Sequence, residues 1–376
     1  MIEIRRIEGR KALKRFVEFA IDLYKGAEYY IPPIISMEVD MHDPVKNPVY
    51  QFCDSIFLMA YRDGQAVGRI AGFVNHRSNE KYHNKVCRFC WIDFIDDEEV
   101  SRALLDSVRA WGKEHGMETL VGPLAPTDVD NEGLLVEGFD QLPTTVNTYN
   151  YPYYERHFQA YGMEREATWY EFRIEAPKAV PERYQRMAQM VQEKYGLRVF
   201  TELNAKRFQR EWGQKLFELM NVSYSDIYGF TEMTQAQIEY YIKLYLPQVP
   251  LRLIRLVADK DDNLIAFGLS LPSLSRAQQR AKGHLFPFGW LYMLRALYVK
   301  GATDTIDFLL MGIRPDFQGK GVNSLIFCDL IPEYQRWGFK YMETNAELVT
   351  NHKIQNVWSD FNPKHHKTRC TYTCSI

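Results

Sequence analysis

The chain has 376 residues, of which 46% are hydrophobic and 25% are charged, a balance typical of a globular protein with two or three domains. Its formal net charge of -2 does not indicate a nucleic-acid-binding protein, which would be expected to have an excess of basic residues. No apolar run reaches the roughly 18 residues that cross a bilayer, and residues 1–6 lack an apolar export core, so we expect a cytoplasmic protein.

Six cysteines are too few for a disulfide scaffold in a chain of 376 residues. Cys87 and Cys90, together with Cys370 and Cys374, raise the alternative of a zinc site. The two pairs lie far apart in the sequence, and both fall in strand-like segments where alternate residues face opposite sides. We therefore predict no metal site.

The first half opens with a predicted strand hairpin, residues 55–61 and 66–74, around the turn Asp63-Gly64. An apolar stripe over 100–111 then predicts a helix that ends near Gly116. Four acids, residues 96–99, precede this helix. They are typical of a helix N-terminus, where negative charge is favourable.

A linker is predicted at 176–181, where two prolines precede a helical pattern from Glu182 to Tyr195 that Gly196 closes. The predicted domains are accordingly 1–176 and 182–376. The second half repeats the order of the first, with a hairpin at 251–258 and 264–271 and a later helix that ends at Gly338. We therefore expect an internal tandem repeat.

A connection at 224–232 separates helical patterns at 205–222 and 235–246. One interpretation, which rests on the family resemblance of the glycine turn described below, is a substrate-shaping loop in which Glu232 holds a cationic amine. The alternative is a plain helix connection in which Thr231 or Thr234 caps the second helix. The candidate substrate-binding residues are Tyr228, Phe230 and Glu232.

Two further segments are rich in aromatic side chains. Residues 284–294 form an aromatic and apolar run that can line an acyl tunnel, touch a membrane or be buried between domains, and burial is the favoured fate. Residues 133–140 and 148–154 contain too much glycine, proline and aromatic sequence for a plain helix or strand, so they are expected to form either a binding wall or a packed crossing between domains.

The most informative segment begins with an apolar run, 306–313, which predicts a buried strand that Pro315 stops. Closely spaced glycines, Gly319 and Gly321, then lead into an amphipathic helix. Glycine permits close approach of the backbone, and free N–H groups at a helix start favour phosphate oxygens. The spacing fits neither a P-loop nor the three-glycine dinucleotide pattern.

This turn resembles the acyl-CoA loop of the GNAT superfamily of N-acyltransferases, whose pattern is Arg/Gln-x-x-Gly-x-Gly/Ala. Gln318, Gly321 and Asn323 occupy the three marked positions, and Asn323 departs from the pattern. Downstream, residues 341–345 are similar to strand five of that fold. The segment Asn351-x-x-Ile354-x-x-Val357-Trp358 is similar to the family's next helix.

The resemblance implies an α/β fold with two GNAT-like domains in tandem, each a mixed, mostly antiparallel central sheet flanked by helices. It covers 182–376 well and the first half weakly. Aligning Gly116 with Gly338 places the four acids at 96–99 where the second half has its glycine turn. Like charges repel, so the first half is expected to be degenerate for CoA binding.

The resemblance also implies the chemistry, which is attack of a primary amine on the thioester of acetyl-CoA or a longer acyl-CoA. For the cofactor it implies these residues: Met311, Ile313, Gln318, Gly319, Lys320, Gly321, Val322, Asn323, Ser324 and Asn351. Candidate catalytic residues are Asp307 and Glu343 as bases and Tyr341 as a proton donor; each carboxylate is otherwise an ordinary strand-end acid. The family's usual tyrosine donor is replaced by Trp358, whose indole has no useful acidity.

Three functions follow from the sequence. The leading one is transfer of an acyl group, for which we expect acetyl, from acyl-CoA to a primary amine. The second is long-chain transfer to a lipid amine such as a sphingoid base, with peripheral membrane contact. The third is a non-catalytic CoA sensor or interaction module, which the loss of the tyrosine at Trp358 favours.

Overall fold

The computed structural model describes residues 1–376, which form two compact units. Unit 1 consists of Met1–Tyr170, Ser275–Tyr292 and His366–Ile376, and unit 2 consists of Glu171–Leu274 and Met293–His365. Each unit therefore draws on both halves of the sequence. The predicted division at 1–176 and 182–376 stays a prediction. None of the helices combines the length and apolar character needed to cross a bilayer.

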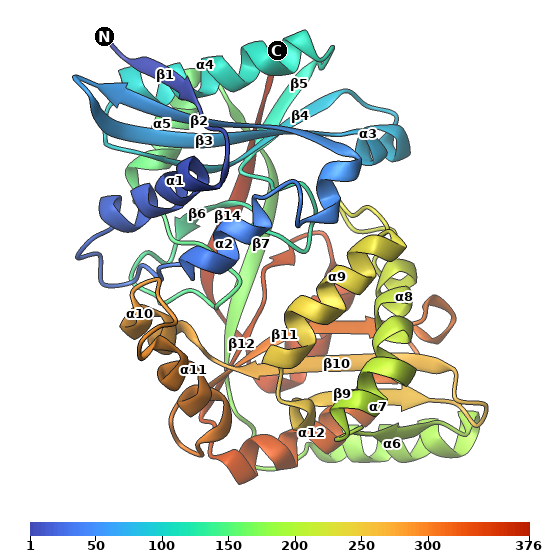
Figure 1. The fold of residues 1–376 in the computed structure, drawn as a ribbon. Coiled ribbons are helices and arrows are strands. Elements are labelled where there is room, and N and C mark those ends of the chain that lie inside the picture. The colour runs from blue at the N-terminus through green and yellow to red at the C-terminus, as the bar shows by residue number, and fades with distance from the viewer. The chain divides into compact units, whose positions relative to one another are not determined.

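Unit 1 is built on a sheet in which the strands follow the order β1-β2-β3-β4-β5-β14 (Figure 1). All of these neighbours are antiparallel except β4 and β5, which run parallel from Val86↔Thr119 to Arg88↔Val121. Its strands are β1 (Glu3–Arg6), β2 (Cys53–Arg62), β3 (Gln65–Asn75), β4 (Val86–Phe94), β5 (Thr119–Gly122), β6 (Leu134–Glu137) and the greater part of β14 (Lys364–Ser375). Its helices are α1 (Arg10–Leu23), α2 (Ile35–Met41), α3 (His76–Tyr82), α4 (Glu98–Glu114), α5 (Tyr153–Tyr161) and α10 (Ser275–Ala281).

Alternation along β2 divides the core of unit 1 between the two faces of the sheet. Ile56 and Leu58 pack in one cluster with the apolar stripe of α4, whereas Phe57 and Met59 pack in another with α1. The β2–β3 turn places Asp63 and Gly64 at φ of 50° and 79°, as a tight hairpin requires. Figure 1 shows α4 on one face of these strands and α1 on the other.

Unit 2 repeats this design, with strands in the order β7-β12-β11-β10-β9-β8. Here β11 and β12 are the parallel pair, from Thr305↔Tyr341 to Phe308↔Thr344, and the other neighbouring pairs are antiparallel. Its strands are the second half of β7 (Glu164–Glu175), β8 (Arg198–Phe200), β9 (Ile254–Ala258), β10 (Leu264–Pro272), β11 (Thr305–Ile313), β12 (Tyr341–Thr344) and β13 (Glu347–Leu348). Its helices are α6 (Glu182–Tyr195), α7 (Ala205–Arg207), α8 (Gln214–Ser223), α9 (Gln235–Tyr245), α12 (Asn323–Trp337) and α13 (His352–Trp358). The residues of α11 (Gly289–Tyr298) are divided, since unit 1 contains those up to Tyr292 and unit 2 those from Met293.

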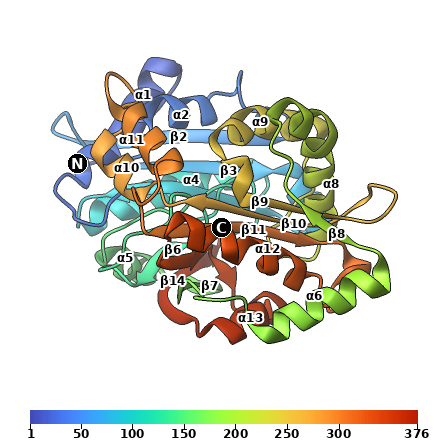
Figure 2. The same ribbon diagram turned by 90° about the horizontal axis from the view of Figure 1, so that it is seen from below.

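The internal repeat is confirmed by the matching order of elements in the two units. In each, an antiparallel hairpin leads to a strand, a helix and a parallel strand: β2-β3-β4-α4-β5 in unit 1 and β9-β10-β11-α12-β12 in unit 2. Figure 2 shows α6 alongside α12, and both helices contribute to the main core of unit 2. The α/β class and the mostly antiparallel sheets agree with the sequence prediction.

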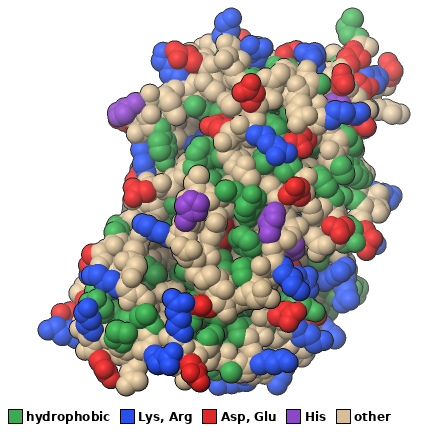
Figure 3. All heavy atoms as spheres, turned by 180° about the vertical axis from the view of Figure 1, so that it is seen from behind, with side chains coloured by type: hydrophobic (Ala, Val, Ile, Leu, Met, Phe, Trp, Pro, Cys, Tyr) green, Lys and Arg blue, Asp and Glu red, His purple; other side chains and the backbone are tan.

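Two sequence expectations are wrong. Residues 134–137 form a regular strand, β6, because their hydrogen-bonding partner is β14 from the far end of the chain. The aromatic run at 284–294 is not buried, since six of its apolar side chains are exposed: Phe286, Phe288, Trp290, Leu291, Tyr292 and Leu294. Elsewhere the surface is mixed, and acidic and basic side chains are interspersed over the face drawn in Figure 3.

Candidate functional site

The parallel strands β11 and β12 of unit 2 separate partway along their length. Their pairing stops at Phe308↔Thr344, where β12 ends, whereas β11 continues beside β10 as far as Ile313. The β10–β11 register also slips, since Leu269 pairs with Leu310 and Ser270 with Phe308. The extra residue, Leu309, is a β-bulge, which turns the local backbone out of the ladder. Beyond Phe308, β11 therefore no longer pairs with β12.

Met311 and Ile313, predicted to contact the acyl donor, lie on this stretch of β11 and are partly exposed. The hydroxyl of Tyr224 donates a hydrogen bond to the Met311 carbonyl at 3.2 Å. A Cβ at Gly312 would lie 2.9 Å from Ser223 Oγ, so the end of α8 sits directly on the strand. The connection after α8 thereby lies over the point where β11 and β12 diverge.

The predicted substrate residues follow in that connection. Phe230 is fully buried and packs edge-on against Tyr224 at 5.9 Å, so it supports the loop. Tyr228 and Glu232 are partly exposed. Thr234 caps α9 and forms a capping box with Gln237, which confirms the capping alternative for this threonine.

The two candidate bases are brought together by the register of the parallel pair. Asp307 on β11 lies directly beside Glu343 on β12, and both carboxylates are buried. Arg173 on β7 pairs with Glu343 in register, and its guanidinium lies 3.4 Å from Glu343 Oε1. The same guanidinium stacks on the ring of Tyr341 at 4.0 Å. One row across the sheet thus contains an arginine and two carboxylates.

The glycine turn forms where the sequence predicted it. A short 3-10 turn, Pro315–Phe317, follows β11, and α12 then begins at Asn323. Gly319 and Gly321 have φ of 74° and 80°, a conformation that favours glycine. The turn is stabilised by a hydrogen bond that Ser324 Oγ donates to the Gly321 carbonyl at 2.6 Å. A Cβ at Gly321 would meet Met187 Sδ at 2.6 Å.

Hydrogen bonds inside the turn use the amides of Lys320 and Ser324, which donate to the carbonyls of Phe317 and Gly321. No bond of this kind is found for the amides of Gly319, Gly321 and Val322. These N–H groups stand at the start of an amphipathic helix, where the aligned peptide dipoles favour an anion. The turn therefore fits a phosphate group.

Lys353, which the sequence reading missed, adds a positive charge to this turn. Its Nζ donates to Gln318 Oε1 at 3.0 Å, and Gln318 Nε2 in turn donates to the Ile313 carbonyl at 3.2 Å. Asn351, predicted to bind the cofactor, is the N-cap of α13, and its side chain accepts from the Ile354 amide at 3.4 Å. The sequence around Lys353 contains no motif that predicts a role for it. The role is visible only from its contact with Gln318 in the folded structure.

Glu347 is a second residue that the sequence reading missed. Trp358 is buried against Phe308 and Phe327, and its indole N–H donates to Glu347 Oε1 at 2.6 Å. The other carboxyl oxygen, Oε2, is buried with no partner. Burial raises the pKa of Glu347 to about 8, although the bond from Trp358 opposes this. Burial thus favours the neutral form of this carboxyl group.

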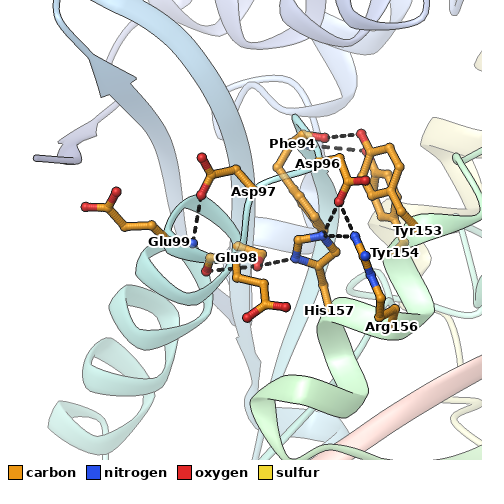
Figure 4. Close-up of polar contacts among 10 residues, drawn as sticks. Phe94, Asp96, Asp97, Glu98, Glu99, Tyr153, Tyr154, Arg156 and His157 are labelled. Atoms are coloured by element: carbon orange, nitrogen blue, oxygen red, sulfur yellow. Dashed lines mark hydrogen bonds and ion pairs between the residues drawn. The ribbon is translucent and has the colours of Figure 1, made fainter.

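In unit 1 the corresponding turn is closed by ion pairs (Figure 4). Asp97 caps α4 by accepting from the Glu99 amide at 2.9 Å, and Arg62 pairs with Asp97 at 2.8 Å. Asp96 pairs with Arg156 and lies 2.8 Å from His157 Nε2, and these contacts lower the pKa of Asp96. A shallow depression beside this turn is lined by His157, Tyr161 and Arg102. In this turn Asp96 and Asp97 are thus paired with Arg156, His157 and Arg62.

No three His, Cys, Asp or Glu side chains gather in a metal-binding arrangement, and the cysteines are free thiols.

Comparison with known proteins gives relatives along almost the whole chain. The chain is 28% identical to Protein YghO of Escherichia coli K12 over 361 residues, which covers 94% of this chain and 90% of that protein. It is 27% identical to the bacterial ceramide synthase of Caulobacter vibrioides over 368 residues, covering 96% of this chain and 94% of that enzyme. No family model matches the chain.

Among solved structures, a tandem GNAT protein from the clavulanic acid biosynthesis pathway superposes with a TM-score of 0.58 at 11% identity. The match covers 100% of this chain and 98% of that protein. Together with the repeated strand–helix–strand order described above, this likeness establishes that the chain has the tandem GNAT fold.

Proposed function

We propose that the protein is an N-acyltransferase that transfers the acyl group of an acyl-CoA to a primary amine, and that unit 2 holds the acyl-CoA. The observation that carries this proposal is the divergence of β11 and β12 immediately before the glycine turn. The edge of β11 beyond Phe308 offers backbone groups to the thioester arm, and the turn offers N–H groups to the diphosphate.

In this proposal the reaction forms a C–N bond and breaks the C–S bond of the thioester. The attacking amine must be neutral, so a proton leaves it, and the departing thiolate takes one up. Asp307 and Glu343, adjacent on β11 and β12, are the candidate acceptors of the amine proton, directly or through water. An amide of Leu309 to Ile313 steadies the carbonyl oxygen.

Glu347 is the best candidate for the proton donor to the thiolate. Its pKa of about 8 leaves it protonated at neutral pH, and that value is close to the pKa of a thiol. Trp358 does not donate the proton, since an indole N–H is not acidic, but it holds the carboxyl group by the 2.6 Å hydrogen bond. Tyr341, stacked under Arg173, is the alternative donor.

For the acceptor we propose a long-chain lipid amine rather than a small polar amine. The support is the relative named as a ceramide synthase, which matches 96% of this chain, because a ceramide is an N-acylated long-chain amine. A small-amine acetyltransferase and a CoA sensor are the competing functions, and measurements of CoA binding and thiol release distinguish them.

The test measures CoA binding and thiol release. A ligand at a hundred times its Kd stabilises the protein by about 2.7 kcal/mol, so CoA, acetyl-CoA and palmitoyl-CoA should each raise the Tm. Addition of a sphingoid base with palmitoyl-CoA should then release free thiol. Thiol release only with acetyl-CoA and small amines would favour the competing acetyltransferase, and binding with no release from any amine would favour the sensor.

The binding site is tested by Asn323→Asp, a change that preserves side-chain size and adds one negative charge where the diphosphate is expected. Since an acid in the first turn of a helix is favourable, α12 should remain folded. We expect CoA affinity to fall by at least about tenfold, or roughly 1.4 kcal/mol. The matched control, Glu99→Gln in the corresponding turn of unit 1, should leave affinity unchanged; the opposite pattern would place the site in unit 1.

A further inference from the structure

The segment Ser275–Tyr292 is a helical hairpin, which we call the aromatic hairpin, that is fixed to unit 1 along one side. Ser275 Oγ donates to the Pro143 carbonyl at 2.8 Å, and Gln279 Nε2 donates to the carbonyls of Glu28 and Tyr30 at 2.8 and 3.0 Å. The Gly283 carbonyl accepts from the Ile35 amide at 2.9 Å. These bonds hold α10 and the following turn beside α1 and α2, as Figure 2 also shows.

The other side of the aromatic hairpin exposes large apolar side chains. Phe286 and Phe288 are 79% and 64% exposed, and Trp290, Leu291 and Tyr292 are between 38% and 45% exposed. The turn itself is well formed: the Trp290 indole N–H donates to the Pro287 carbonyl at 3.0 Å, and a Cβ at Gly289 would lie 1.9 Å from the His284 carbonyl oxygen. A fixed turn therefore presents a contiguous apolar patch, which in a folded protein marks an interaction surface.

The charged side chains of the aromatic hairpin itself all have one sign. Between Ser275 and Lys300 the sequence contains no Asp or Glu, although the chain as a whole has a net charge of -2. The basic residues of the hairpin are all exposed: Arg276, Arg280 and Lys282. Aromatic side chains that project among cations are suited to the headgroup region of an anionic bilayer. A second copy of this chain would instead bring like charges together across a two-fold axis.

We propose that the aromatic hairpin docks the protein on the surface of anionic membranes. Phe286 and Phe288 enter the boundary between headgroups and acyl chains, Trp290 and Tyr292 lie at headgroup level, and Arg280 and Lys282 contact lipid phosphates. This surface lies within unit 1 and does not depend on the acyl-transfer chemistry of unit 2.

Co-sedimentation of the full chain with phosphatidylcholine vesicles, with and without phosphatidylglycerol, tests the proposal. We expect wild-type protein to sediment with the anionic vesicles and to be released at high salt, because surface charge is screened. Phe286→Ser with Phe288→Ser should weaken this binding by at least about tenfold through loss of inserted apolar area. Arg280→Glu with Lys282→Glu should abolish the preference for phosphatidylglycerol.

The matched control is Val45→Ser with Leu203→Ser, which removes two apolar side chains that are 93% and 69% exposed elsewhere. This variant should sediment like wild type, and all variants should keep the wild-type Tm because the altered side chains are exposed. The proposal is overturned if wild-type protein fails to sediment with anionic vesicles, or if the serine variants of the hairpin and the control sediment equally. It is also overturned if the wild type is a dimer in size-exclusion chromatography that the hairpin variant makes monomeric.

Discussion

Trp358 stands where the family motif has a tyrosine, and this replacement gives the buried Glu347 a hydrogen-bond partner. The sequence resemblance predicted a proton-donating tyrosine where Trp358 stands, and the structure places a buried carboxyl group against the indole instead. No local pattern identifies Glu347, because its importance comes from burial and from a partner in a following helix. The glycine turn, in contrast, could be predicted from the sequence. Its residues are consecutive, and the positive φ values at two of them favour glycine.

The raised pKa of Glu347 predicts how stability depends on pH. The carboxyl group titrates near 4.5 when unfolded and near 8 when folded, so its contribution to stability is fully present below about pH 4.5 and is lost as pH rises through about 8. Within this window the loss is at most about 1.4 kcal/mol per pH unit. Glu347→Gln, which cannot ionise, should therefore show a shallower fall in the free energy of unfolding, measured by urea denaturation across the window.

The matched control for this prediction is Glu193→Gln, which neutralises an exposed carboxylate on α6. Partly buried acids in unit 1 titrate in the same range, since desolvation raises the pKa of Asp128 to about 7 and of Asp130 to about 6. They contribute equally to all three proteins, so only the difference between the curves matters. If the Glu347→Gln and Glu193→Gln proteins have the same slope, the carboxyl group of Glu347 is not buried in the neutral form.

At the scale of elements, local pattern predicted the helices and hairpins but not the short strands with distant partners. The period of α6 and of α12 is visible in sequence because an amphipathic helix packs on a core with its own regular stripe. The strand β6 has only Leu134 and Leu135 as buried residues, and its ladder partner, β14, lies near the other end of the chain. The glycine and aromatic residues around β6 obscure its strand pattern in the sequence. The strand is defined only by its hydrogen-bonded pairing with β14.

Asn150 gives β6 a second partner, and this predicts a large effect from one substitution. Its Oδ1 accepts from the Leu135 amide at 2.8 Å and its Nδ2 donates to the Leu135 carbonyl at 3.0 Å, so the side chain substitutes for a neighbouring strand. Asn150→Ala leaves both buried backbone groups without these bonds, and we expect the free energy of unfolding to fall by about 2 kcal/mol. Chemical denaturation measures this, with the exposed Asn84→Ala as the control that should change it by less than about 0.5 kcal/mol. An equal effect in both variants would show that the two hydrogen bonds between Asn150 and Leu135 do not form.

At the scale of the whole molecule, each unit takes strands from both sides of the predicted linker at 176–181. In unit 1, β14 pairs with β5 from Tyr372↔Gly122 to Ser375↔Thr119. In unit 2, β12 pairs with β7 from Tyr341↔Glu175 to Glu343↔Arg173. The sequence reading placed a repeat boundary at the linker, and proximity in sequence gives no sign of strands that are exchanged across it.

This exchange predicts the result of cutting the chain between Lys178 and Ala179, both of which are exposed. A protease site inserted there should be cleaved in the folded protein, and the two fragments should then co-elute in size-exclusion chromatography and separate only in denaturant. The reason is that separation would remove β14 from the sheet of unit 1 and the end of β7 from that of unit 2, leaving open strand edges. If the fragments separate under native conditions and each keeps a cooperative thermal transition, the domains are the contiguous halves 1–176 and 182–376, and the strands exchanged across the linker do not stabilise the fold.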